Sequence, residues 1–162
     1  MDRTQEQDYI QLIQEHQGVI NKILYLYADD AESKKDLKQD ILVEAWKSYP
    51  SFEGRSKFST WLYRIGLNVA FARLRKNKKQ HYVPLEETNY NEQTISKLQG
   101  QELLDAILRL LQPVEKSIVL LLIEGYNQKE ISKLIGLSAV NTRVKVSRLR
   151  KKLAEYGFKN IA

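Results

Sequence analysis

The spacing of apolar residues constrains the fold more than any other feature of this sequence. Leu37, Ile41 and Ala45 follow one another at intervals of four, and Phe58, Leu62, Ile65 and Val69 form a second stripe at intervals of three and four. Such spacing places residues on one face of an α-helix, whereas a half-buried strand alternates apolar and polar positions. No segment shows a convincing alternation, so the sequence predicts an all-α fold.

Capping residues, glycines and prolines indicate where the predicted helices begin and end. Thr4, with Gln7 three residues later, predicts the start of a first helix that continues to Tyr27, with Gly18 as a candidate irregularity. A second helix is predicted from Ser33 to Pro50 and a third from about Phe58 to Arg75. Four more helices are predicted to begin near Leu98, Pro113, Gln128 and Ala139, with Gly125 and Gly136 just after helix ends.

Composition changes after the third helix. Residues 80–97 contain Pro84, three glutamates and many Asn, Gln and Thr residues, with almost no apolar periodicity. This stretch is predicted to be a linker. The chain of 162 residues therefore divides into a domain at 1–79, a linker at 80–97 and a domain at 98–162. Helical domains of this size bury only about 60% of their unfolded surface, so binding partners would help to stabilise them.

Charge and cysteine content restrict the function classes. The chain has a net charge of +6, which suits an anionic partner, either nucleic acid or a lipid surface, although an inert basic surface is an equal alternative. It has no cysteine for a disulfide or thiolate metal site. Its N-terminus is polar, and the longest apolar run, residues 118–123, is too short to span a bilayer. We expect a cytoplasmic protein without membrane insertion, catalytic residues, metal or cofactor.

Residues 127–153 have the pattern of a helix-turn-helix. Asn127 and Glu130 predict a capping box, Gly136 supplies a left-handed turn residue, and Ser138 caps the next helix. Within that last helix, the spacing predicts one buried stripe of four residues. The stripe consists of Thr142, Val146, Leu149 and Leu153.

The outer surface of this last helix is strongly basic. Six of the eleven residues from Arg143 to Leu153 are Arg or Lys, and none is acidic. A helix of this kind suits the major groove of DNA, although a solvated basic face is the alternative. Lys151 and Lys152 lie beyond the expected groove, where phosphate contact or no contact is predicted. The predicted groove-facing residues are Asn141, Arg143, Val144, Lys145, Ser147 and Arg148.

The N-terminal half combines an acidic helix with an aromatic and basic one. The second helix has an acidic and amide face beside Trp46, which suits contact with a protein or simple solvation. The third helix and the preceding loop, residues 51–57, combine aromatic and basic side chains. Single-stranded nucleic acid is bound by such a combination, because bases stack on aromatic rings and cations contact the backbone. Core packing is an equal alternative for Phe58, Trp61 and Leu62.

Three stretches together resemble the extracytoplasmic-function sigma factors of the sigma-70 family. They are DLKQDILVEAW (36–46), SFEGRSKFSTWLYRIGLNVAFARLRK (51–76) and GLSAVNTRVKVSRLRKKL (136–153). The resemblance implies a region 2 domain, a linker and a region 4 domain, without regions 1.1 or 3. Its implied partners are the β′ and β subunits of core RNA polymerase, promoter DNA and, as a candidate, an anti-sigma factor. The chain departs from the family at Ile41–Leu42, at Gly66, and at Ala139 and Val140, where the −35 preference is affected.

The resemblance also assigns roles to residues. Asp36, Gln39, Asp40, Glu44 and Trp46 match the part that grips the β′ clamp helices. The loop with Phe52, Arg55 and Lys57 matches the one that captures a flipped −10 base, and Arg64, Asn68, Arg73 and Arg75 match the part that holds the melted strand. The groove-facing residues of the last helix, Asn141, Arg143, Val144, Lys145, Ser147 and Arg148, match the −35 reader.

Three other function classes fit less of the sequence. A helix-turn-helix repressor or activator explains the C-terminal half, but not the acidic face beside an aromatic and basic helix. An enzyme is disfavoured because His16 and His81 lie in no metal or triad pattern and no GxxxxGK loop occurs. A peripheral membrane protein would need a clean apolar face, which Arg64 and Asn68 interrupt in the third helix.

Overall fold

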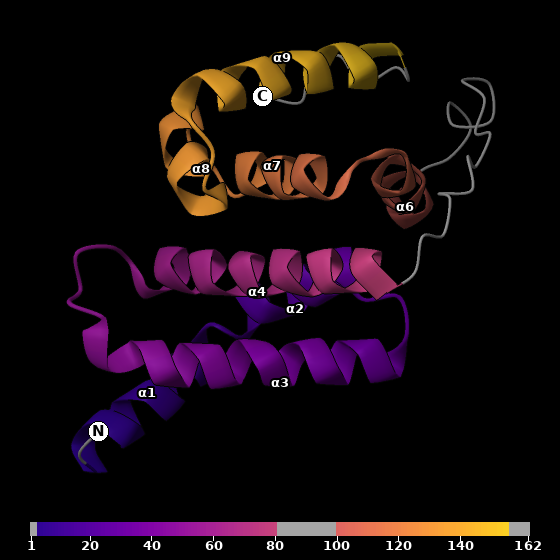
Figure 1. The fold of residues 1–162 in the computed structure, drawn as a ribbon. Helices are drawn as coiled ribbons and strands as arrows, with labels where there is room; N and C mark the ends of the chain where they lie inside the picture. Colours follow the sequence, from indigo (N-terminus) through magenta and orange to yellow (C-terminus); the bar gives the residue numbers. More distant parts are fainter. Residues whose placement is uncertain (1–2, 81–99, 156–162) are drawn as a thin grey trace. The chain divides into compact units, whose positions relative to one another are not determined.

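The computed structural model describes residues 3–80 and 100–155. In these residues the chain consists of α-helices and one short 3-10 helix, and no strand occurs (Figure 1). The chain divides into two compact units, Met1–Tyr82 and Val83–Ala162. The predicted all-α, two-domain class is therefore confirmed. Apart from residue 80, the linker predicted at 80–97 lies outside the described residues, and so does His81.

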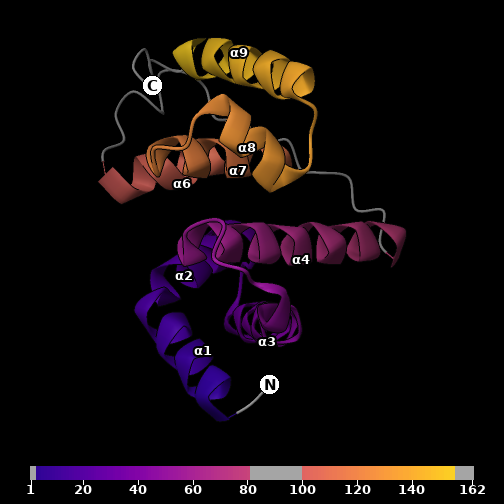
Figure 2. The same cartoon turned by 90° about the vertical axis from the view of Figure 1, so that its left-hand side faces the viewer.

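The N-terminal unit is built around a bundle of three helices. It contains α1 (Arg3–Glu15), α2 (Gln17–Tyr27), α3 (Ala31–Ser48), the 3-10 helix η1 (Tyr49–Ser51) and α4 (Phe58–Gln80). Helices α2, α3 and α4 pack against one another, and α1 extends from α2 at an angle, outside this bundle (Figure 2). Most of the apolar positions read from the sequence meet in its core, where Ile20, Ile23, Leu37, Ile41 and Leu62 are fully buried. In α4 the predicted stripe is partly wrong, because Ile65 and Val69 are only half-buried and Leu67 is fully buried instead.

Gly66 allows α2 and α4 to approach closely. A Cβ atom at residue 66 would lie only 2.5 Å from Cδ1 of Ile23 and 3.6 Å from Cδ1 of Ile41. Because Ile23 is fully buried, its side chain has little room to move away. Glycine lowers the intrinsic stability of a helix by up to about 1 kcal/mol. Here it also makes room for the core, a role that the sequence alone did not reveal.

Two predicted helix starts and one predicted continuous helix are corrected by the structure. Helix α3 begins at Ala31 rather than Ser33, because the Asp30 carboxylate accepts the backbone N–H of Ser33 at 2.7 Å and so caps the helix. This hydrogen bond is the main cause of the lowered pKa of Asp30. Thr4 lies inside α1 and does not cap it. The predicted first helix is interrupted at His16, next to Gly18, and forms α1 and α2.

Helix α4 extends beyond its predicted end at Arg75 to Gln80. Most residues that follow Arg75 in α4 are Lys or Gln, which have good helix propensity, and no proline occurs before Pro84. The sequence therefore holds no signal that would stop the helix at Arg75. The last turn carries the cationic end of α4 further along the same axis.

The C-terminal unit contains α6 (Gly100–Leu110), α7 (Pro113–Ile123), α8 (Gln128–Ile135) and α9 (Ala139–Glu155). The predicted capping box is present, since Asn127 accepts the backbone N–H of Glu130 at 3.0 Å and the Glu130 carboxylate accepts that of Asn127 at 2.8 Å. Pro113 stands at the start of α7, and Gly136 adopts the predicted left-handed conformation with φ of 70°. The fully buried core residues are Ile118, Leu121, Ile131, Val146, Leu149 and Leu153.

Candidate functional site

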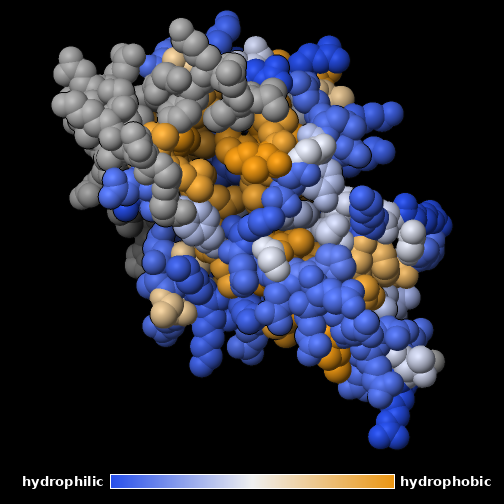
Figure 3. Space-filling model, turned by 180° about the vertical axis from the view of Figure 1, so that it is seen from behind, coloured by the Kyte–Doolittle hydropathy of each residue, from blue (hydrophilic) through white to orange (hydrophobic). Residues whose placement is uncertain are grey.

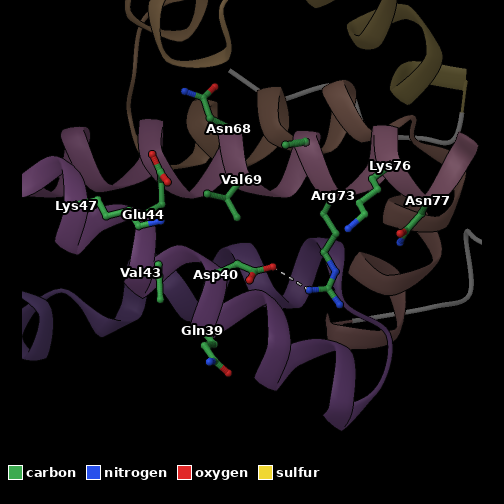
Figure 4. A pocket seen from close by; sticks show the side chains of 11 residues that line it. Gln39, Asp40, Val43, Glu44, Lys47, Asn68, Val69, Arg73, Lys76 and Asn77 are labelled. Atoms are coloured by element: carbon green, nitrogen blue, oxygen red, sulfur yellow. Dashed lines mark hydrogen bonds and ion pairs between the residues drawn. The ribbon is translucent and has the colours of Figure 1, made fainter.

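A groove runs between α3 and α4 on the N-terminal unit (Figure 4). Helix α3 lines it with the carboxylates of Asp40 and Glu44, and helix α4 lines it with Asn68 and the cations Arg73 and Lys76. The groove thus joins residues predicted to contact polymerase with residues predicted to contact DNA. The residues that line the groove are Gln39, Asp40, Val43, Glu44, Lys47, Asn68, Val69, Ala72, Arg73, Lys76 and Asn77.

Arg73 bridges the two helices. Its guanidinium donates to the Asp40 carboxylate at 3.1 Å and to the Asp36 carboxylate at 3.3 Å, and the Asp40 contact is drawn in Figure 4. The Arg73 side chain is 29% exposed and the two aspartates are more exposed, so each ion pair contributes at most about 1 kcal/mol. The arginine therefore neutralises part of the acidic face, which sequence reasoning had treated as separate from the basic end of α4.

Trp46 of α3 is held by a tyrosine from α1 and does not line the groove. The ring of Tyr9 lies edge-on to Trp46 with 5.1 Å between centroids, and the Tyr9 hydroxyl donates to the carbonyl of Leu42 at 3.0 Å. Burial raises the pKa of Tyr9 to about 12, so the phenol remains a hydrogen-bond donor even in moderately alkaline solution. The sequence had predicted no role for Tyr9.

Phe52 anchors the loop between η1 and α4. It is half-buried and packs against Tyr49, Phe58 and Trp61, with 5.2 Å between the Phe52 and Trp61 centroids and 5.7 Å between Phe52 and Phe58. Burial is the main cause that raises the pKa of Tyr49, within the same aromatic cluster. The core-packing alternative therefore holds for Phe58 and Leu62, which are buried, whereas Trp61 and Phe52 are only half-buried within the aromatic cluster.

The remaining candidate residues around this loop and on α4 are exposed. Gly54 adopts φ of 70° at the tip of the loop, and Arg55 pairs there with Glu53. The aromatic cluster holds one end of the loop while its charged tip faces solvent. The structure does not gather these cations into one site. The exposed candidates are Arg55, Lys57, Arg64, Asn68 and Arg75.

Helices α8 and α9 form the predicted helix-turn-helix. The Ser138 hydroxyl accepts the backbone N–H of Asn141 at 3.2 Å and caps α9 as expected. The predicted stripe of Thr142, Val146, Leu149 and Leu153 is buried. Every residue predicted to face the major groove of DNA is exposed. These residues are Asn141, Arg143, Val144, Lys145, Ser147 and Arg148. Figure 3 shows that the C-terminal unit also carries hydrophobic surface on the side seen in that view.

Lys152 makes contacts that the sequence did not predict. Its ammonium donates to the carbonyl of Leu110 at 2.6 Å and lies 3.3 Å from the Glu115 carboxylate. Glu115 in turn accepts the backbone N–H of Gln112 at 2.8 Å, at the start of α7. Lys152 therefore ties the end of α9 to the junction of α6 and α7, whereas its neighbour Lys151 is exposed.

We expect Lys152→Met to lower the free energy of unfolding by about 1–2 kcal/mol, because it removes a charge-assisted hydrogen bond and leaves a carbonyl without its donor. The control Lys151→Met makes the same substitution at an exposed position. It should change the free energy of unfolding by less than about 0.5 kcal/mol. Urea denaturation followed by circular dichroism measures both. Equal stability of the two variants would mean that the Lys152 contacts contribute nothing.

Neither a metal site nor a membrane span is found in the described residues. Residues 3–80 and 100–155 hold no group of three or more His, Asp or Glu side chains that could bind a metal ion. Within the same ranges, no helix is long and apolar enough to cross a membrane.

Two family models match the chain. Residues 12–80 match Sigma-70 region 2, and residues 101–153 match Sigma-70, region 4. The two matches follow the order of the two compact units. Together they include α2, α3 and α4, and almost all of the helices from α6 to α9.

Two curated relatives of the chain are ECF RNA polymerase sigma factors. The chain is 26% identical over 147 residues to the ECF RNA polymerase sigma factor SigM of Mycobacterium tuberculosis, which covers 89% of this chain and 74% of the relative. It is 30% identical over 78 residues to the ECF RNA polymerase sigma factor SigW of Bacillus subtilis, which covers 48% of this chain and 42% of the relative.

Two solved structures share the fold. The sigma factor RpoE from Bartonella quintana, solved with the anti-sigma factor NepR, matches with a TM-score of 0.64 and 22% identity, covering 93% of this chain and 94% of that one. CnrH, solved with the cytosolic domain of CnrY, matches with a TM-score of 0.55 and 23% identity, covering 92% and 86%.

Proposed function

The chain belongs to the extracytoplasmic-function group of the sigma-70 family, and from this premise we propose a role for each of its surfaces. As a sigma factor it directs promoter-specific initiation of transcription by RNA polymerase. In the proposed division, residues 1–79 bind core polymerase and the −10 element, and residues 98–162 bind the −35 element. Residues 80–97 connect them. The cytoplasm, where RNA polymerase acts, is the proposed location.

The α3 side of the groove is the proposed contact with the β′ subunit. Asp36, Gln39, Asp40, Glu44 and Trp46 are all exposed on one helix, and the groove beside them contains apolar side chains as well as charge. Carboxylates next to an apolar floor suit arginine or lysine side chains with long aliphatic stems. An acidic face of this kind would repel phosphates, which supports a protein partner on this side.

The loop at 51–57 and the outer side of α4 are the proposed −10 surface. Arg64, Asn68 and Arg75 are exposed on α4, and Arg55 and Lys57 are exposed on the loop. Arg73 was assigned to the same strand, but its guanidinium is engaged by Asp36 and Asp40. We therefore propose that Arg73 holds α3 against α4 and affects DNA binding only by positioning the basic end of α4.

Helix α9 is the proposed −35 reader. It lies on a capped helix-turn-helix, buries one stripe and exposes a basic surface. Each unit alone would bind DNA weakly and in a salt-sensitive manner. When polymerase holds both units at the promoter, the second contact becomes effectively intramolecular and the combined affinity rises.

The observation that supports this function most directly is the presence of the acidic face of α3 and the basic helix-turn-helix on one chain. A repressor or activator would need only the second. An anti-sigma factor is a further proposed partner, because RpoE of Bartonella quintana was solved with one. The proposal includes no catalytic residue, cofactor or metal.

The proposed function predicts stable association of the full chain with core RNA polymerase. Gel filtration of the mixture should give a holoenzyme peak, and runoff transcription on genomic fragments should start at discrete promoters only when the chain is added. Core polymerase without the chain is the control. Specific promoter binding by the chain alone, with no effect of polymerase, would instead indicate an ordinary transcriptional repressor or activator.

A further inference from the structure

Two valines near the start of helix α9 point almost directly away from the C-terminal unit. Successive residues of an α-helix are rotated by about 100°, so the buried stripe defines which side chains point directly away from the unit. With Thr142, Val146, Leu149 and Leu153 on the inner side, Val140 and Val144 project within about 30° of the opposite direction. The cations Arg143 and Lys145 leave the helix from its two flanks, roughly at right angles to that direction.

Both valines are exposed to solvent, Val140 more than Val144. Val140 is 69% exposed and Val144 is 42% exposed, and Val140 is the most exposed large apolar side chain among the described residues. They lie one turn apart, so their side chains form one short ridge. The sequence departs from its family at Val140, and the ridge exists because of that residue.

The surroundings of the ridge identify its partner as DNA. Basic residues flank and follow it along α9, and no acidic residue occurs between Arg143 and Leu153. A partner must therefore be anionic at its edges and apolar at its centre. The major groove has this chemistry, because phosphates border it and each thymine presents a C5-methyl group inside it.

We propose that Val140 and Val144 read thymine methyl groups at two positions of the −35 element. This inference rests on the proposed role of α9 as the −35 reader. A helix turned with its buried stripe away from DNA brings the two valines closest to the bases, while Arg143 and Lys145 reach toward the phosphates on either side. In this arrangement the apolar ridge contributes base preference, and the flanking cations position the helix in the groove.

The spacing of the valines sets the spacing of the thymines. Four residues of helix correspond to a rise of about 6 Å, and successive base pairs are about 3.4 Å apart. The two methyl groups should therefore lie about two base-pair steps apart, on either strand. A preference for thymine at one position alone would correspond to only one of the two valines.

The test uses holoenzyme assembled from the full chain and core RNA polymerase. Promoter duplexes with a randomised −35 segment are selected by binding, and we expect thymine at two positions. Each selected thymine is then replaced by deoxyuridine, which removes only the methyl group. Loss of one buried methyl-sized contact should weaken binding of the wild-type holoenzyme about fourfold.

Alanine variants link each methyl group to one valine. Val144→Ala should bind thymine and deoxyuridine equally at one position, and Val140→Ala should do so at the other. Both side chains are exposed, and alanine is the better helix former, so folding should be preserved. The matched control is Ile123→Ala, which shortens an exposed branched side chain at the end of α7 and should retain the fourfold discrimination at both positions.

Three outcomes would overturn the inference: selected sequences without thymine, equal wild-type binding of thymine and deoxyuridine, or full discrimination by both alanine variants. Failure of the proposed function looks different. The triple variant with Arg143, Lys145 and Arg148 changed to Ala should weaken −35 binding strongly if α9 reads DNA at all. If the triple variant binds weakly but both valine variants still discriminate thymine from deoxyuridine, only the proposed role of the valines is rejected. If the triple variant binds as well as wild type, the assignment of α9 to the −35 element is rejected.

Discussion

Replacing both Asp40 and Glu44 by Lys is expected to abolish binding of the chain to core RNA polymerase. The two residues lie one turn apart on α3 and line the same groove, so the double change converts its acidic side into a basic one. Like charges brought together at an interface cost several kcal/mol, which corresponds to at least a hundredfold loss of affinity. The new lysine at residue 40 would also face Arg73, which now pairs with Asp40 at 3.1 Å.

Competition of a labelled wild-type chain for core polymerase measures this loss. The matched control is the double variant Asp29→Lys and Glu32→Lys, which makes the same change of charge at exposed positions outside the groove. The control should bind core polymerase within about threefold of wild type, as expected for charges outside an interface. Circular dichroism should show unchanged helicity for both. If the groove variant still copurifies with core polymerase at wild-type yield, the contact lies on another face of the unit.

Phe52→Ala is expected to reduce formation of the open promoter complex at least tenfold, with a smaller effect on the closed complex. Phe52 packs against three aromatic rings and thereby fixes the end of the loop whose charged tip faces solvent. Removing a partly buried phenyl ring costs about 1–3 kcal/mol, less than the 3–5 kcal/mol of a fully buried one. A loop without its anchor would have to pay more conformational entropy to hold an extruded base.

A leucine at the same position separates anchoring from direct base stacking. Phe52→Leu retains most of the apolar volume in the cluster but has no ring to stack on a base. Permanganate footprinting of unpaired thymines should show near wild-type opening for Phe52→Leu and little opening for Phe52→Ala. Equal defects in the two variants would mean that the phenyl ring itself contacts the base, and equal loss at the closed and open stages would remove the loop from the opening step.

Much of the architecture could be read from local sequence. The four-residue spacing in α3, the capping box at Asn127 and Glu130, and the left-handed Gly136 each depend on residues within a few positions of one another. Local signals of this kind are present in the sequence itself, so element type, the buried stripe of α9 and its exposed basic surface were predicted. The errors at Thr4, Ser33 and Arg75 concern helix ends. There, a competing capping residue or the absence of a stop signal determined where the helix begins or ends.

The contacts between helices could not be read in this way. Periodicity indicates which face of a helix is buried, but not which side chain on another helix it meets. The pairing of Arg73 with Asp36 and Asp40, the tie from Lys152 to Leu110 and Glu115, and the packing of Phe52 all join residues that come together only when the helices are packed. The sequence by itself thus determined the helices and the charge of each surface. The tertiary structure decided which charged and aromatic groups are engaged inside the protein and which remain exposed for a partner, because burial and partner geometry arise only from packing.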